Sequence, residues 1–565
     1  MPSRLSMFLG SLLFLQLLST ASAEFSAEDA AKATGVSRGV AAVIDTELET
    51  AAALAEGGEF VVHLLAPKEE KVGPLREEIS KRGLGGRIVV REFAAGGPLP
   101  YADRFLNLLV AERDALPAAE RLRVLSQRGA AYLHDNGKWS VEKPEADPRL
   151  DDWTHRWYDA TGNCVSHDRL AAYPQMVQWQ HGPAMEDGTA DGKLPRLAAG
   201  LWVLIDSSSG DLVCRDADNG TLVWRQPFQL SPRDDLAIAA GCVYFYHEPS
   251  EGERDGKRPT TGPLVAIDLE TGELVQTFEH SLRSGTAQPI EFEDRDESRL
   301  RRETPVPWFV VNEQVIVQAY DEELVVLDRA TGEQRFTKKL EGATWFSPVV
   351  QGELLLAAES AAPARRGRHD GSVNVRAVTA FRATNGEQLW RNERVHPERE
   401  VQEKDRSFVS RAEFKPMSLS GDLVLLHASS YQFRQGGSVA VLEASSGREL
   451  WRQEFQPKER YTQGSQRAVI RGEEVALLDG LGALRFEART GKPLGEPLTA
   501  AKDDRRMARA NGACTASRAT LDWLICNAYL YVGPEGTPQV NFGARGACGQ
   551  GVIPANGLIY VPPTP

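Results

Sequence analysis

The stretch "DADNGTLVWR", residues 216–225, decides the fold because variants of it recur along the chain. Within it, Asp216 is followed four positions later by Gly220, and Gly220 is followed four positions later by Trp224. Asn219 and Gly220 can adopt the positive φ angle that a tight connection between two right-twisted strands requires. The stretch therefore predicts a hairpin corner.

Six copies of this corner follow one another along the chain. Their glycines are Gly220, Gly272, Gly332, Gly386, Gly447 and Gly491, which lie 44 to 61 residues apart. The residue four positions before the glycine is acidic in five copies and is Arg382 in the sixth. The residues four positions after it are Trp224, Gln276, Phe336, Trp390, Trp451 and Gly495. A recurrence on this scale is typical of propellers and solenoids.

The sequence between the corners is rich in short apolar β segments, such as "LWVLID" (201–206) and "CVYFYHE" (242–248). Each repeat therefore predicts about four strands of a meander, and the last two of them join at the corner. The bulky residue after the corner is expected to pack against the neighbouring sheet and bury a face that a single sheet would expose. Charged inserts, including residues 292–303, are expected to be solvated loops.

The first 23 residues predict a secretory signal peptide. They contain Arg4, a Leu/Phe-rich stretch and the small-residue exit Ala21-Ser22-Ala23, and polar sequence follows at once. A retained membrane anchor is the alternative, and no later segment has the pattern of a membrane span. We therefore expect an exported protein, periplasmic or extracellular, with no integral membrane segment after cleavage.

Residues 24–146 have a different sequence pattern from the repeats, because segments typical of strands alternate with segments typical of helices. The segments 58–67, 86–93 and 104–113 predict strands, as do 39–45 and 130–134, and the segments 68–83 and 119–129 predict helices. Such alternation indicates a small α/β domain with a parallel sheet. The expected division is thus a signal peptide (1–23), an α/β domain (24–146) and a repeat domain (147–565).

Charge and cysteine content limit the partners and the redox chemistry. The formal net charge is −14 and the basic residues are scattered, so nucleic acid is not an expected partner. Cys514, Cys526 and Cys548 crowd the C-terminus and are candidates for disulfide bonds, which persist in an oxidising compartment. Cys214 and Cys242 are better explained as thiols within strands, and spacing alone does not fix any pairing.

Corners such as "LVAIDLETGELV" and "VAVLEASSGRELW" resemble the repeat of the pyrroloquinoline-quinone (PQQ) dehydrogenase-like β-propellers, a superfamily that also contains scaffold members. The segments 151–168, 177–183 and 545–563 are similar to exported PQQ-like propeller proteins of planctomycete-type bacteria. In many of those, an S-adenosylmethionine (SAM) methyltransferase-like domain precedes the propeller. The resemblance implies a mainly β chain, in which a small Rossmann-like, methyltransferase-like α/β domain precedes a propeller of seven or eight blades. It also implies that the propeller could be incomplete at its C-terminal end.

The residues themselves argue against both activities that the resemblance suggests. A SAM site needs a glycine-rich turn after the first strand and an acidic residue at the end of the second, but no glycine follows residues 39–45 before Gly57, and Ala66 and Pro67 end the second strand. PQQ enzymes of the superfamily hold the cofactor with a disulfide between adjacent cysteines, a tryptophan floor and calcium, and no two cysteines are adjacent here. We expect a degenerate methyltransferase-like domain and no cofactor, with PQQ and calcium as the alternative.

One string of residues has the chemistry of a transition-metal site. His155, Asp159, Cys164 and His167 could ligate a metal, but the string lacks a second Cys-x-x-Cys or His pair. We favour a structural cluster in which Trp153 and Trp157 pack inward, and we predict no metal-binding and no catalytic residues.

Two classes of function remain after these tests. The first is a non-catalytic exported propeller that binds a protein or small ligand through its loops or central channel. The second is an oxidoreductase that uses PQQ or another cofactor in the central funnel, with SAM-dependent methyl transfer as a further alternative. The six corner glycines are structural in either case.

Overall fold

The computed structural model of the chain describes the following residues: 25–45, 47–94, 97–180, 195–206, 208–230, 235–247, 262–282, 290–293, 300–303, 308–361, 375–395, 399–403, 406–410, 413–414, 416–429, 437–455, 467–479, 482–499, 516–526, 530–541 and 551–561. The chain divides into two compact units, Met1–Glu145 and Ala146–Pro565. The predicted signal peptide lies outside the described residues. Among the helices that are described, none has both the length and the apolar character that crossing a membrane requires.

The first unit is an α/β domain with one six-stranded sheet in the order β3-β2-β1-β4-β5-β6. Strands β1 to β5 pair in parallel, and β6 runs antiparallel to β5 at the edge. The strands are β1 (Arg38–Ile44), β2 (Glu59–Ala66), β3 (Ile88–Glu92), β4 (Leu106–Glu112), β5 (Leu125–Asp135) and β6 (Lys138–Glu142). The helices are α1 (Ala27–Thr34), α2 (Glu49–Gly57), α3 (Glu69–Lys81), the 3-10 helix η1 (Arg113–Ala115) and α4 (Ala118–Val124).

The helix expected over residues 119–129 is wrong in its second half. It ends at Val124, and Leu125 begins β5 because the chain there extends to pair with β4, with Leu125 opposite Leu106 and Ala130 opposite Leu108. The backbone hydrogen bonds to β4 make this apolar segment a strand. Hydrophobic periodicity alone does not distinguish a strand from a helix in such a segment.

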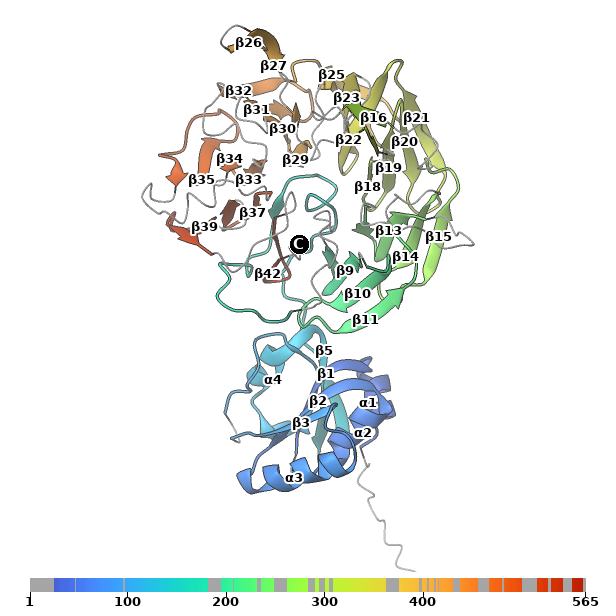
Figure 1. The fold of residues 1–565 in the computed structure, drawn as a ribbon, viewed down its shortest axis with the longest axis vertical. Helices are drawn as coiled ribbons and strands as arrows, with labels where there is room; N and C mark the ends of the chain where they lie inside the picture. The colour runs from blue at the N-terminus through green and yellow to red at the C-terminus, as the bar shows by residue number, and fades with distance from the viewer. Residues whose placement is uncertain are drawn as a thin grey trace, which may run out of the picture. The chain divides into compact units, whose positions relative to one another are not determined.

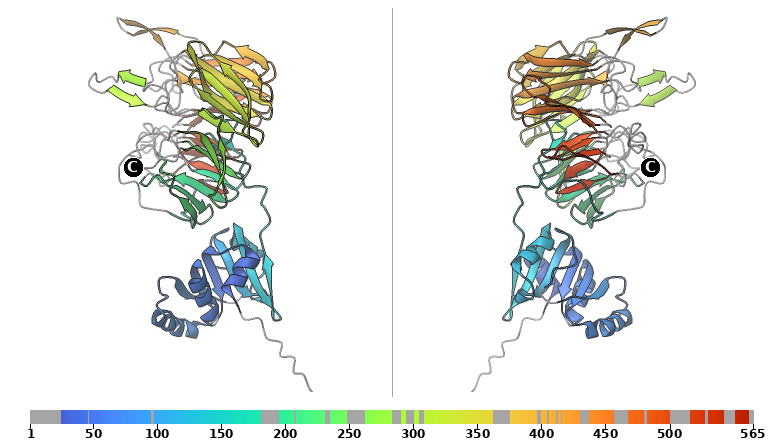
Figure 2. Two further views of the ribbon diagram at one scale, coloured as in Figure 1. Left: turned by 90° about the vertical axis from the view of Figure 1, so that its right-hand side faces the viewer. Right: turned by 90° about the vertical axis from the view of Figure 1, so that its left-hand side faces the viewer.

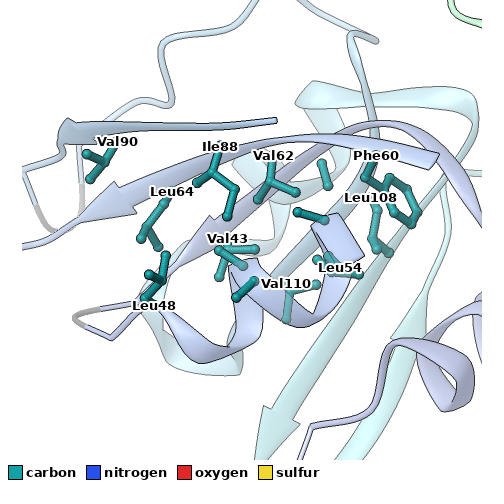
Figure 3. Packing of buried hydrophobic residues seen from close by; sticks show 14 of the residues in the cluster. Val43, Leu48, Leu54, Phe60, Val62, Leu64, Ile88, Val90, Leu108 and Val110 are labelled. Carbon is teal, nitrogen blue, oxygen red and sulfur yellow. The ribbon is translucent and has the colours of Figure 1, made fainter. Parts of the chain in front are cut away.

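Apolar residues of period two form the core on one face of this sheet. Figure 3 shows side chains of β1 to β4 gathered beside the helix that carries Leu54. Val43, Val62, Ile88 and Val110 are all at most 3% exposed, and a second apolar cluster covers the opposite face. Burial on both faces is what a parallel sheet requires.

The second unit is a ring of small antiparallel sheets, which Figure 1 shows side by side around a common axis. Sheets 1 to 4 each have four strands. Sheet 1 contains β8 (Arg196–Ala198), β9 (Leu201–Ile205), β10 (Leu212–Asp216) and β11 (Leu222–Gln226), and sheet 2 contains β12 (Ala237–Ala239), β13 (Cys242–Tyr246), β14 (Leu264–Asp268) and β15 (Leu274–Phe278). Sheet 3 contains β18 (Trp308–Val311), β19 (Val315–Tyr320), β20 (Glu323–Asp328) and β21 (Gln334–Lys339), and sheet 4 contains β22 (Ala343–Gln351), β23 (Leu354–Ala361), β24 (Val375–Arg382) and β25 (Gln388–Asn392).

The remaining sheets continue the ring toward the C-terminus. They are sheet 5, β28 (Glu413–Phe414), β29 (Ser418–Ser420), β30 (Leu423–Ser429), β31 (Gly437–Glu443) and β32 (Glu449–Phe455); sheet 6, β33 (Arg467–Arg471), β34 (Glu474–Asp479), β35 (Gly482–Glu487) and β36 (Leu498–Thr499); and sheet 7, β37 (Arg518–Thr520), β38 (Leu524–Cys526), β39 (Leu530–Val532) and β40 (Pro538–Val540), with β7 (Val165–Ser166) parallel to β37. A terminal hairpin, β41 (Ile553–Ala555) and β42 (Leu558–Tyr560), follows. The mainly β architecture that the repeats predict is confirmed.

Two further hairpins belong to the inserts between sheets. They are β16 (Ile290–Glu293) with β17 (Leu300–Glu303), and β26 (Arg399–Glu403) with β27 (Arg406–Ser410). Figure 2 shows both of them projecting from the same face of the ring. The insert over residues 292–303, expected to be a loop, thus contains strand residues at both ends.

Each predicted corner connects the last two strands of a sheet. The six corner glycines have φ angles between 68° and 76°, and each N–H donates to the carbonyl of the residue four positions earlier. At Asp268 the side chain completes the turn, because its Oδ1 accepts hydrogen bonds from Glu270 N at 2.9 Å and Thr271 N at 2.8 Å. The acidic residue and the glycine of the pattern thus have separate tasks in one turn.

An aromatic ring lies against the corner glycine of a sheet at five places, and four of these rings come from the preceding sheet; a Cβ built on the glycine would lie 2.5 to 2.9 Å from the ring. We call these rings the docking aromatics. They are Trp179 at Gly220, Trp224 at Gly272, Phe336 at Gly386, Trp390 at Gly447 and Trp451 at Gly491. The indole N–H of each tryptophan also donates to the corner it meets, at 2.8 to 3.0 Å. Neighbouring sheets are therefore joined by one repeated contact.

Trp179 makes this contact without belonging to a sheet. It lies before β8, and its Nε1 donates to Ala217 O at 3.0 Å, as the other docking tryptophans do. The terminal hairpin packs beside it, because Tyr560 Oη donates to the same carbonyl at 2.9 Å. Trp179, from the segment that precedes sheet 1, and Tyr560, from the C-terminal hairpin, thus contact the same corner of sheet 1.

We predict that Gly447→Ala lowers the free energy of unfolding by about 2 kcal/mol more than Gly421→Ala. Both glycines have left-handed φ angles, 68° and 59°, so both substitutions introduce backbone strain of roughly 1–3 kcal/mol. A Cβ at Gly447 would lie 2.5 Å from the Trp390 ring, whereas one at Gly421 meets nothing within 4 Å. Urea denaturation of the two variants measures the difference, and equal losses would contradict the docking contact.

Candidate functional site

The middle of the ring holds residues 151–168, which we call the hub segment; Figure 1 shows the chain between β6 and β8 passing there. The segment hydrogen-bonds to every sheet of the ring in chain order. Its contacts are Asp151 O with Asn556 N of the terminal hairpin, Trp153 with Leu197 of sheet 1, Thr154 O with Ile238 N of sheet 2, His155 Nε2 with Val311 N of sheet 3, Ala160 O with Val350 N of sheet 4, Thr161 O with Leu419 N of sheet 5, the Asn163 side chain with Ile470 of sheet 6, and Cys164 O with Ala519 N of sheet 7.

The hub segment keeps its path through local turns and one close approach. Gly162 has a φ of 70°, and a Cβ there would lie 2.6 Å from Met417 O, so only glycine lets the segment pass sheet 5. Asp168, which is 0% exposed, ends the segment by accepting four backbone hydrogen bonds, including one from Gly557 N at 2.7 Å. The Asp168 carboxylate thus hydrogen-bonds both to the start of the hub segment, at Asp151, and to the terminal hairpin, at Gly557.

Three arginines converge on the hub segment from the innermost strands. Arg196, Arg467 and Arg518 are the first residues of β8, β33 and β37, and all three are at most 4% exposed. The guanidinium carbons of Arg467 and Arg518 each lie 4.7 Å from the centroid of the Trp157 ring. Cation–π contacts of this kind gain strength when water is excluded.

These arginines bind the hub segment and neighbouring backbone. Arg467 Nη2 donates to Gly162 O at 2.9 Å, and Arg196 donates to Asp235 Oδ1 at 2.6 Å and to Leu236 O at 2.7 Å. Burial lowers the pKa of Arg196 to about 10, and burial together with neighbouring arginines lowers the pKa of Arg518 to about 10. Both remain cations at neutral pH, so the middle of the ring carries concentrated positive charge that faces inward.

The four residues of the His155–His167 string, for which we predict no metal, have separate partners. His155 Nε2 accepts from Val311 N at 3.2 Å, Asp159 Oδ1 accepts from Thr161 N at 2.9 Å, and Cys164 is buried beside Arg518. His167 is exposed, and its ring lies 5.7 Å from that of Tyr158. In the described ranges no three His, Cys, Asp or Glu side chains lie close enough together to hold a metal ion.

We predict that His155 makes the stability of the ring depend on pH. Burial, followed by the charge of Arg196, lowers the pKa of His155 to about 3, below the value of about 6.5 in an unfolded chain. The unfolded chain therefore binds the extra proton first, so the stabilising contribution is complete above about pH 6.5 and is lost as the pH falls. Relative to His155→Gln, the wild-type free energy of unfolding should fall by up to about 1.4 kcal/mol per pH unit.

Urea denaturation of wild type and His155→Gln at pH 7, 6, 5 and 4 measures this difference. The variant lacks the titrating imidazole. Subtracting its free energy of unfolding from that of the wild type therefore removes the contributions of all other titrating groups. A difference in free energy of unfolding that stays constant from pH 7 to pH 4 would show that His155 is protonated as easily in the folded ring as in the unfolded chain.

Four of the six cysteines, Cys164, Cys214, Cys242 and Cys526, lie among the described residues. Cys526, proposed from sequence as a disulfide partner, is buried, and its Sγ donates to Gly482 O at 3.2 Å. Cys514 and Cys548 lie outside the described residues, and their pairing stays a prediction. Cys214 lies in β10 and Cys242 begins β13.

Sequence reasoning placed Trp153 and Trp157 in a structural cluster but missed the arginines and Trp179. A signal for the arginines exists: "RLA", "RAV" and "RAT" open β8, β33 and β37, each with arginine before a small or apolar pair. Trp179 carries no such signal, because it lies in "VQWQHGP" without a corner glycine before it.

The two tryptophans of the hub segment do not fit the tryptophan floor of a PQQ site. Trp153 is 0% exposed and lies against Tyr158 and Arg518, and Trp157 is covered by Arg467 and Arg518, so neither offers an open face as a cofactor floor. In the first unit, Ala66 occupies the end of β2, where SAM binding needs an acidic residue, and the turn before α2 has no glycine.

A ring of antiparallel sheets with one corner per sheet defines the β-propeller class. A family model described as outer membrane protein assembly factor BamB matches residues 260–512, which confirms the PQQ-like repeat in that part of the chain. No curated protein matches the sequence significantly.

Solved structures with similar folds fall into three groups. BamB from Moraxella catarrhalis is 16% identical over 60% of this chain and 78% of its own, with a TM-score of 0.31. A quinohemoprotein alcohol dehydrogenase from Pseudomonas putida HK5 is 12% identical over 66% of this chain and 73% of its own, with a TM-score of 0.32. A SAM-dependent methyltransferase from Aquifex aeolicus is 21% identical over 19% of this chain and 62% of its own, with a TM-score of 0.17. At these values the likenesses decide nothing about activity.

Proposed function

We propose that this chain is an exported, non-catalytic binding or scaffold protein built on a PQQ-like propeller. The observation that supports this best is that the polar groups converging in the ring are buried and directed at the hub segment. A catalytic funnel presents such groups to a substrate. Here Arg467 binds Gly162 O, Asn163 binds Ile470, and His155 accepts from Val311, so each group maintains the ring.

The same proposal covers the closure of the ring and the first unit. The terminal hairpin, with Trp179 beside it, takes an eighth position next to the seven sheets, since it packs against both sheet 7 and sheet 1. The first unit is an appended module that does not transfer methyl groups, because it lacks both the glycine-rich turn and the acidic residue that SAM binding needs. The family match to an assembly factor of the outer membrane supports export to the periplasm and a role in protein contacts.

Addition of PQQ and calcium to the purified full chain tests the non-catalytic role. We expect no reduction of an artificial electron acceptor in the presence of an alcohol, and no change in Tm on adding PQQ with calcium. Reduction that depends on both PQQ and calcium would overturn the proposal. Calorimetry with SAM tests the first unit, and micromolar binding would revive methyl transfer.

A further inference from the structure

At the junction between sheets 6 and 7 no docking aromatic lies on the corner glycine, and no other side chain replaces it as Gln276 and Phe278 do at Gly332. The fourth residue after Gly491 is Gly495, where other repeats have Trp390 or Trp451. A Cβ built on Gly536, in the corner after β39, would meet only Leu498 Cδ2, at 3.8 Å. At the five filled junctions the corresponding distance is 2.5 to 2.9 Å to an aromatic ring.

The backbone of sheet 6 explains the missing ring. After the bridge between Phe486 and Pro493, the chain turns through Gly495 with a φ of 69° and rejoins the sheet only at Leu498, opposite Ala483. The fourth strand is therefore two residues long, whereas β32 of sheet 5 has seven. The chain bypasses the position from which a ring would reach the next sheet.

A cavity of about 420 Å³ lies at this junction, within the range of about 300–1,000 Å³ that small-molecule sites occupy. The lining residues come from both sheets and from the corner, and they include Arg471, Arg485, Leu498, Pro534 and Gly536. Leu498 and Pro534 supply the accessible apolar side chains, and polar atoms make up most of the remaining lining. The cavity thus lies at the corner against which an indole packs at other junctions.

Arg485 gives the cavity a hydrogen-bond donor. Its Nη2 donates to Leu494 O at 3.2 Å, and its Nη1 lies 3.7 Å from Glu474 Oε2. Its Nε is buried and has no hydrogen-bond partner among the described residues. Other parts of the Arg485 side chain are accessible, so an acceptor oxygen on a ligand in the cavity can meet the guanidinium there. Arg471, which binds Glu474 at 2.5 Å, adds a second cation to the wall.

We propose that this cavity binds a small aromatic acid, in which one flat ring carries a carboxylate. The ring lies on the Gly536 corner, as a docking aromatic does elsewhere, and the carboxylate accepts from Arg485. The proposal extends the proposed binding function to a named site and ligand class. It is tested by binding at this cavity alone, so its failure leaves the test with PQQ and calcium unaffected.

Isothermal titration calorimetry on the full chain tests the proposal with three probes: indole-3-acetate, indole and acetate. We expect indole-3-acetate to bind with a Kd on the order of 0.1–1 mM, as its size allows. Indole should bind at least about fivefold more weakly because it lacks the acid, and acetate should not bind detectably, since one charge-assisted hydrogen bond at a partly open site gains little. No binding of indole-3-acetate at 10 mM would overturn the proposal.

Two variants with matched controls locate the site. Leu498→Trp fills the cavity and should abolish binding, whereas Leu274→Trp, on the exposed face of β15, should leave it unchanged. Arg485→Met should lower the affinity for indole-3-acetate about tenfold and leave that for indole within twofold, whereas Arg448→Met should change neither. Near-UV circular dichroism verifies folding. Binding that survives both Leu498→Trp and Arg485→Met would place the ligand elsewhere and contradict the assignment.

Discussion

Replacement of Trp390 by alanine is expected to lower the free energy of unfolding of the ring by about 3–5 kcal/mol. The ring of Trp390 is 8% exposed, lies against the Gly447 corner and belongs to an apolar cluster that spans sheets 4 and 5. Its Nε1 also donates to Ala444 O at 2.8 Å, and the truncation leaves that carbonyl without its donor. Urea denaturation followed by far-UV circular dichroism measures the loss.

Gln276→Ala is the matched control for Trp390→Ala. Gln276 occupies the same repeat position, four residues after Gly272, but Phe278 shares its contact with Gly332. We therefore expect Gln276→Ala to cost less than about 1 kcal/mol, since little apolar area leaves the junction. Losses of equal size in the two variants would show that the docking aromatics do not join the sheets.

Replacement of Asn163 by leucine is expected to cost about 2–6 kcal/mol through the hub segment. The Asn163 amide is 5% exposed; its Nδ2 donates to Ile470 O at 2.8 Å and its Oδ1 accepts from Ile470 N at 3.0 Å. Leucine has a similar volume but leaves both backbone groups buried without partners, at about 1–3 kcal/mol each.

Gln453→Leu serves as the control for Asn163→Leu, because Gln453 is exposed on β32 and its amide donates to the neighbouring Glu454 O at 3.2 Å. An exposed substitution of this kind stays within about 0.5 kcal/mol. The two free energies of unfolding come from the same urea titration. A cost for Asn163→Leu no larger than that of the control would mean that sheet 6 does not depend on the hub segment.

The parts of the fold that local sequence determines were predictable. A turn that needs an acidic residue, a left-handed glycine and a following strand leaves a short pattern, and the repetition of that pattern predicts a mainly β ring, which is confirmed. The alternation in residues 24–146 predicts the parallel sheet of the first unit in the same way. The end of α4 was misplaced because pairing of Leu125 with β4 depends on residues far away in sequence.

The candidate site was predictable only in part, because it depends on contacts between distant residues. Trp153 and Trp157 were expected to pack inward, but nothing local shows that Arg467 and Arg518 lie on the ring of Trp157. The hub segment itself has no regular pattern, since successive carbonyl groups bind different sheets. The cavity at Gly536 follows from an absence, the aromatic residue missing after Gly491, which becomes informative only beside the filled junctions.

Hydrogen–deuterium exchange at the innermost strands tests the central claim, that the hub segment joins the sheets into one ring. The amides of Ile238, Val350, Leu419 and Ala519 lie on edge strands and donate to hub carbonyls at 2.8 to 3.0 Å. Without the hub segment, inward-facing edge amides exchange quickly. We expect peptides containing these residues to be as protected as those of the central strand β31, and less protected in Asn163→Leu. Exchange at the rate of exposed edge strands in the wild-type protein would contradict the account.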